Sequence, residues 1–145
     1  MNIIVIGATG MIGASVVAEA ARRGHSVTAI SRSGQKPAGA AQAQAIDLSD
    51  SAAIVQLINA ADVTVISIPP DRSGGSHEPV LKAHRDLIAA KPSGRFLVVG
   101  GAGSLKVNGV RLVDMPDFPA AYFKESTTFT QVLEAYQASS GLAWT

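Results

Sequence analysis

The chain has 145 residues, and 47% of them are hydrophobic, which is enough to fill the core of one ordinary domain. Only 16% are charged and the formal net charge is +1, so the chain lacks the positive field that attracts nucleic acid. We therefore expect no nucleic-acid partner. Cysteine is absent, which excludes disulfides and thiolate metal sites and is typical of a reducing, cytoplasmic compartment.

The first segment of the chain is predicted to be a buried strand. Asn2 to Ile6 is a β-branched run that Gly7 closes, a pattern typical of a strand covered on both faces in a parallel sheet. The run has no basic flank and is far shorter than a bilayer is thick, so we expect a soluble protein without a membrane partner.

A helix and a second strand follow and complete a β-α-β unit. The helix is predicted from Met11 to Arg23, with Gly24 as its C-terminal cap. Its apolar residues fall on one face: Ile12, Val16 and Ala20. The second strand, Ser26 to Ser31, comes after only two linking residues, which indicates a short return to the sheet.

The same alternation continues through the middle of the chain. Gln42 to Ile46 is predicted to be a weak strand that ends at Asp47, and the pair Asp50-Ser51 is placed to cap a helix that runs to about Asn59. A strong strand, Asp62 to Ile68, is stopped by two prolines.

The next elements are a loop, a helix and a fifth strand. The Gly- and Ser-rich stretch from Asp71 to Ser76 is predicted to be mobile, and Glu78 to Ala90 is predicted to be helical. Arg95 to Val99 is the fifth strand. Strands that alternate with helices indicate an α/β fold with a doubly wound parallel sheet and three layers.

The pattern changes after the fifth strand. Leu105 to Val113 carries Asn108-Gly109 between apolar residues, which predicts a tight hairpin. A helix from about Ala121 to Ser139 follows, and Leu142 to Thr145 begins a sixth strand. Because a parallel strand cut at its fourth residue leaves a sheet edge unfinished, we expect one domain, residues 1–145, that lacks a C-terminal part.

A glycine-rich turn is the main functional motif. Gly7, Gly10 and Gly13 are spaced G-x-x-G-x-x-G where the first strand meets the first helix. Glycines there allow a tight turn and the approach of a pyrophosphate, which free amides and the helix dipole attract. The intervening residues Thr9, Met11 and Ile12 are expected to bind the cofactor too. The alternative is a compact turn without a ligand.

The residue that follows the second strand favours NADP(H) over NAD(H). NAD-binding proteins of this kind usually carry a carboxylate here for the ribose hydroxyls, whereas this chain has Arg32 between two serines. A guanidinium suits a phosphate. The alternative is a solvated arginine.

Other strand ends should line the same crevice, because ligands of open α/β sheets bind beyond the carboxyl ends of the strands. Asp47 could accept from the adenine amino group, or it could cap a turn. The other candidates for contacts with the cofactor are Leu48, Ser67, Ile68, Pro69, Gly100 and Gly101.

Four motifs together resemble the atypical short-chain dehydrogenase/reductases. They are Gly-Ala-Thr-Gly-Met-Ile-Gly, Ser-Arg-Ser, Val-Val-Gly-Gly-Ala-Gly-Ser-Leu, and Asp-Phe-Pro followed by a helix and Leu-Ala-Trp-Thr. The chain is most similar to the NAD(P)H-binding group that includes NADH-flavin reductase-like and biliverdin IXβ reductase-like proteins. The resemblance implies a Rossmann fold, a reduced nicotinamide cofactor, and a sixth strand with a C-terminal segment that helps to close the substrate pocket.

The catalytic residues are less well marked. Related dehydrogenases use a tyrosine and a lysine four residues later, but here Tyr122 is followed by Lys124, and residues two apart do not share a helical face. Ser104 and Tyr122 are the nearest candidates for binding or protonating a substrate oxygen. Alternatively, Ser104 bonds a turn and Tyr122 packs at the surface. The three histidines have no metal-ligand spacing, and we expect no metal site.

Three functions are compatible with these residues. The first is an NADPH-dependent reductase of a flavin-like or other conjugated small molecule, in which the cofactor supplies the chemistry and the protein aligns it. The second is a non-catalytic NADP(H)-binding redox sensor. The third is a sugar-nucleotide epimerase or dehydratase, which the missing tyrosine-lysine spacing disfavours. No pattern in the sequence predicts the oligomeric state.

Overall fold

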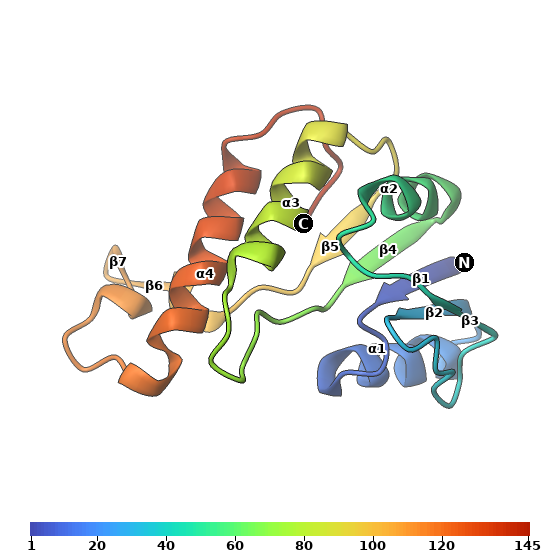
Figure 1. The fold of residues 1–145 in the computed structure, drawn as a ribbon, viewed down its shortest axis with the longest axis horizontal. Helices are drawn as coiled ribbons and strands as arrows, with labels where there is room; N and C mark the ends of the chain where they lie inside the picture. The colour runs from blue at the N-terminus through green and yellow to red at the C-terminus, as the bar shows by residue number, and fades with distance from the viewer.

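The computed structural model describes residues 1–145, and it has one parallel sheet between two layers of helices (Figure 1). The strands stand in the order β3-β2-β1-β4-β5, and all their pairings are parallel. Their bounds are Asn2–Ile6 (β1), Ser26–Ser31 (β2), Gln42–Ala45 (β3), Val63–Ile66 (β4) and Phe96–Val98 (β5). The predicted doubly wound, Rossmann-like fold is confirmed; β1 and β2 have the predicted bounds and the other strands are slightly shorter.

Helices cover the two faces of the sheet unequally. One face carries only α1 (Met11–Arg22), whereas the other carries α2 (Ser51–Ala60), α3 (Glu78–Ala90) and α4 (Ala120–Gln137) (Figure 1). Two separate apolar clusters reflect this division, one of 7 buried residues on the α1 side and one of 13 on the other. The α2 cap is as predicted, since the Asp50 carboxylate accepts a hydrogen bond from the Ala53 amide.

The apolar face of α1 differs from the predicted one. The buried residues are Gly13, Val17 and Ala20, whereas Ile12 is 45% exposed and Val16 is partly buried. The cause is tertiary, because α1 packs on β1 and β2 and no helix covers β4 and β5 on that face. Ile12 and Val16 therefore line an open surface groove of about 640 Å³.

Three other rings lie around Tyr136, which belongs to the larger cluster. The Tyr136 ring centroid lies 5.7 Å from that of His84, 5.8 Å from that of Phe96 and 5.1 Å from that of Trp144. Nδ1 of His84 lies 3.0 Å from the Tyr136 hydroxyl oxygen. His84 and Trp144 thus pack in the core between α3, α4 and the sheet.

The last third of the chain forms the predicted hairpin and begins the predicted strand. The short strands β6 (Lys106–Val107) and β7 (Val110–Arg111) pair antiparallel around Asn108 and Gly109, whose φ angles are 52° and 84°. Two 3-10 turns flank them, η1 (Ala102–Ser104) and η2 (Leu112–Asp114). Trp144 then makes a parallel bridge to Phe96 of β5. None of the helices combines the length and the hydropathy that a bilayer span requires.

Candidate nucleotide-binding site

The three glycines of the turn differ in what a side chain at each position would meet. Gly7 has a φ of 84°, and a Cβ there would lie 2.2 Å from the Ser67 carbonyl oxygen. A Cβ on Gly13 would lie 2.1 Å from the Gly7 carbonyl oxygen, whereas one on Gly10 would lie 3.3 Å from that oxygen. Gly7 and Gly13 are therefore required by the packing of strand, turn and helix. Gly10 is exposed, so the outer side of the turn is accessible to a ligand at this position.

The amides around this turn are free to bind a ligand. The Gly10 amide donates to the Gly7 carbonyl oxygen at 3.0 Å, and the first α1 bond runs from the Ala14 amide to the Gly10 carbonyl oxygen. Gly10 is the N-cap, and no side chain caps the helix. Four amides consequently have no acceptor within the protein, namely those of Thr9, Met11, Ile12 and Gly13. Free amides and a positive helix end are what an anion needs.

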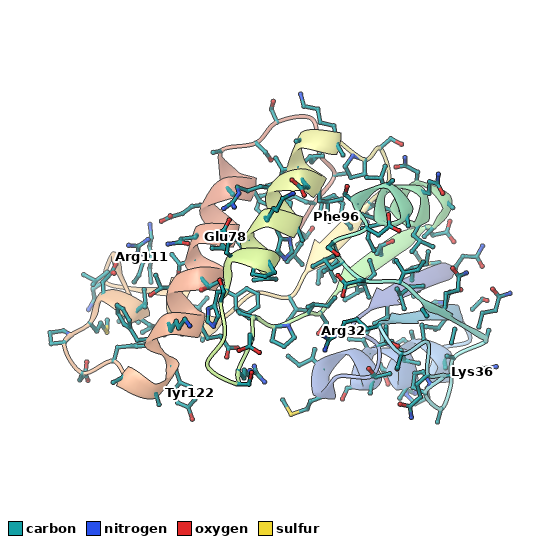
Figure 2. The ribbon with its side chains drawn as sticks, in the orientation of Figure 1. Arg32, Lys36, Glu78, Phe96, Arg111 and Tyr122 are labelled. Carbon is teal, nitrogen blue, oxygen red and sulfur yellow. The ribbon has the colours of Figure 1, made fainter.

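Arg32 follows directly after the last residue of β2. It is exposed, and its guanidinium makes no hydrogen bond or ion pair within the protein. Figure 2 labels it at the end of the sheet where the glycine turn lies. A guanidinium without a partner can turn toward a phosphate without first breaking a bond.

Asp47 has the turn-capping contacts that were one of its two predicted roles. Its Oδ1 accepts from the Ser49 amide at 2.9 Å and from the Ser49 hydroxyl at 2.7 Å. These bonds lower the pKa of Asp47, and the charge of Arg32 contributes to the same direction. Both bonds end on Oδ1, which leaves Oδ2 available to a ligand.

The remaining strand-end candidates differ in accessibility. Ser67 is buried and its amide donates to the Ile6 carbonyl oxygen, Ile68 packs against the core, and Pro69 is exposed. Leu48 is a member of the core cluster and only 6% exposed. After β5, a Cβ on Gly100 would meet nothing within 4 Å, and one on Gly101 would meet Phe129 at 3.4 Å. Their contacts with a cofactor stay predictions.

The two catalytic candidates, Ser104 and Tyr122, make no hydrogen bond to each other. The Ser104 hydroxyl donates to the Gly101 carbonyl oxygen at 3.0 Å, which is the turn-bonding role considered above. Tyr122 projects from the start of α4 and is 64% exposed (Figure 2). Lys124 donates instead to the Gly75 carbonyl oxygen. Tyr122 and Lys124 therefore do not form a tyrosine-lysine pair that could donate a proton to a substrate.

The loop after β4 makes contacts that the sequence did not predict, and its mobility stays a prediction. Asp71 accepts from the Ser73 and Gly75 amides, and Arg72 forms a two-bond ion pair with Glu125 of α4. His77, which ends the loop, is 9% exposed. Arg72 and Glu125 lie about fifty residues apart in the chain, so their ion pair could not be predicted from spacing in the sequence. No three His, Asp or Glu side chains gather where they could hold a metal ion.

The match to a family model covers nearly the whole chain. Residues 7–145 match the model described as NAD(P)H-binding, and the match begins at the first glycine of the turn. The chain belongs to the NAD(P)H-binding family. A nicotinamide cofactor is the ligand class that this family membership supports.

The similar proteins and the similar solved structures are longer than this chain. The uncharacterized protein YwnB of Bacillus subtilis is 34% identical over 155 residues, which is 100% of this chain and 70% of YwnB. A putative exported protein of Burkholderia pseudomallei is 37% identical with a TM-score of 0.82, and a putative NADH-flavin reductase of Streptococcus pneumoniae is 31% identical with a TM-score of 0.79. Both matches cover 99% of this chain and 69% of the other chain.

Proposed function

We propose that the protein is an NADPH-dependent reductase that transfers hydride to a flavin-like or other conjugated small molecule. The observation that supports this most is the set of four partnerless amides at the glycine turn, together with an unpaired guanidinium at the end of β2. The first suits a pyrophosphate and the second suits the additional 2′-phosphate of NADPH.

In this proposal the residues of the chain bind and align, and they do little chemistry. The amides of Thr9, Met11, Ile12 and Gly13 hold the pyrophosphate, and Arg32 holds the 2′-phosphate. NADPH, when bound, supplies the hydride. The exposed strand ends at Pro69 and Gly100 border the space for nicotinamide and acceptor. A conjugated acceptor takes its proton from water, so an assembled side-chain donor is not required.

The preference for NADPH is tested by Arg32→Asp. A charge-assisted contact to phosphate is worth about 1.5–3 kcal/mol, so the variant should bind NADPH on the order of 100-fold more weakly while NADH affinity stays within about threefold. Arg95→Asp is the matched control, because Arg95 is also exposed and precedes β5 at the opposite end of the sheet. Equal discrimination by wild type and Arg32→Asp would remove the basis for the NADPH assignment.

The reductase activity is tested by NADPH oxidation with FMN, riboflavin and quinones as acceptors. Turnover with at least one of them is expected, and its loss in Arg32→Asp at limiting NADPH would tie it to this site. A folded, NADPH-binding protein that oxidises the cofactor with none of these acceptors would contradict the proposal.

A non-catalytic redox sensor is the second candidate. Ser104 is engaged in its own turn and Tyr122 is exposed, so neither residue is placed to protonate an acceptor. A sensor must distinguish the two redox states, so NADPH and NADP⁺ should then differ in affinity by at least about tenfold. Equal affinities would exclude the sensor. The cytoplasmic location stays a prediction from the sequence.

A further inference from the structure

The segment that follows β4 connects the glycine turn to α4. At its first end, the Ser67 carbonyl lies against Gly7 so closely that no side chain fits between them. At its other end stands His77, the N-cap of α3, with its ring between the loop and α4. His77 therefore joins to α4 the segment that begins against the glycine turn.

The hydrogen bonds of His77 depend on its protonation. Nε2 lies 2.9 Å from the Asp71 carbonyl oxygen, which can only accept, so Nε2 carries a hydrogen. Nδ1 lies 2.7 Å from the Thr128 hydroxyl oxygen, and that hydroxyl lies 2.9 Å from the Lys124 carbonyl oxygen. When Thr128 donates to Lys124, Nδ1 must carry a second hydrogen. A doubly protonated ring satisfies all three contacts at once.

A neutral ring can keep only part of this arrangement. With no hydrogen on Nδ1, the Thr128 hydroxyl must turn away from the Lys124 carbonyl oxygen and donate to the ring. One hydrogen bond is lost in that exchange. The bond between His77 and Thr128 joins the loop to α4 with either ring, and the bond that a neutral ring loses lies within α4.

Charged groups of both signs lie on the elements around the ring. Asp71 and Arg72 belong to the loop, and Lys124 and Glu125 lie on α4 within about one turn of Thr128. On α3 the nearest charge is Glu78, which pairs with Arg85. The α3 dipole opposes a cation at this position. The carboxylates of Asp71 and Glu125 favour one, and the charge of His77 contributes to the lowered pKa of both, after hydrogen bonds from Ser73 and Arg72, respectively.

We propose that His77 is a positioning residue of the reductase site, which fixes the segment between the glycine turn and α4 through Asp71 and Thr128. The effect of His77 on catalysis rests on the proposed function. The attachment of the loop to α4 does not rest on it, because both elements belong to this chain.

The attachment is tested by amide hydrogen exchange of Ser73 and Gly75 in the ligand-free protein. Loss of one hydrogen bond corresponds to about fivefold faster opening, so Thr128→Val should lower the protection of these amides about fivefold at pH 6. Thr128→Ser, which keeps the hydroxyl, should restore it. Thr130→Val is the matched control, because Thr130 makes the same bond to the carbonyl four residues earlier and does not contact His77.

Equal loss of protection in Thr128→Val and Thr130→Val would overturn the proposal, and so would no loss in either variant.

The catalytic consequence has a separate measurement. Thr128→Val should raise KM for the acceptor severalfold and leave the Kd for NADPH within about twofold, and Thr128→Ser should return KM to the wild-type value. An unchanged KM alongside a loosened loop would refute the positioning role. A protein that binds no nicotinamide nucleotide would refute the proposed function and leave the exchange result intact.

Discussion

The Gly7 carbonyl oxygen stands only 2.1 Å from the point where a Cβ of Gly13 would lie, so the first turn of α1 rests directly on the backbone of the glycine turn. The obstruction is backbone and not the end of a flexible side chain. A substitution at Gly13 therefore has to move the helix or the turn.

We expect Gly13→Ala to lower the free energy of unfolding by about 1–3 kcal/mol, the usual cost of overpacking a tight contact. It should also weaken NADPH binding, because the displaced helix carries three of the four free amides. Denaturant unfolding measures the first effect. Gly100→Ala is the control, since a Cβ there meets nothing within 4 Å, and equal stability of the two variants would contradict the packing argument.

Asp47 and Ser49 allow capping and ligand binding to be separated. Asp47→Ala removes the acceptor of both bonds and the free Oδ2, whereas Ser49→Ala removes only one donor. Both variants should lose up to about 1 kcal/mol of stability. Only Asp47→Ala should also weaken NADPH binding. If the two variants bind NADPH alike, Asp47 is a turn cap and not an adenine contact.

Asp50 is predicted to matter for the stability of α2 alone. Its side chain accepts from the Ala53 amide, and loss of such a cap costs about 1 kcal/mol. Asp50→Ala should show that loss in denaturant unfolding without a change in NADPH affinity. Asp117→Ala, which removes an exposed carboxylate that has no hydrogen-bond partner, should leave stability unchanged. Similar losses in the two variants would refute the capping role.

The features that could be predicted from the sequence are local ones. The unit from β1 to β2, the Asp50 cap and the Asn108-Gly109 turn each depend on residues a few positions apart, and the structure has all three. The glycine turn and Arg32 are local in the same sense. Their geometry follows from one strand-turn-helix connection and one strand end.

The features that could not be predicted depend on distant neighbours. The buried face of α1 was misjudged because Ile12 would be core only if a helix covered β4 and β5 on that side. The contacts of the loop after β4 could not be predicted because Glu125 and Thr128 lie about fifty residues further along the chain. Periodicity within a segment contains no information about such partners.

His84 should make stability depend on pH. Burial lowers its pKa from 6.5 to about 4, so between these values the unfolded chain binds a proton that the folded chain does not. Stability is therefore lost as the pH falls through this window, by about 2 kcal/mol at pH 5 relative to pH 7. His84→Gln should lack this part of the pH dependence in denaturant unfolding. An identical dependence in the variant would show that His84 is not its source.

Isothermal titration calorimetry of NADPH against the folded wild-type protein is the most direct measurement of the central claim, that the free amides of the glycine turn bind a dinucleotide. The account predicts saturable heat at one site per chain, with NADPH bound more tightly than NADH. No heat with either nucleotide, from protein whose circular dichroism shows it to be folded, would contradict it.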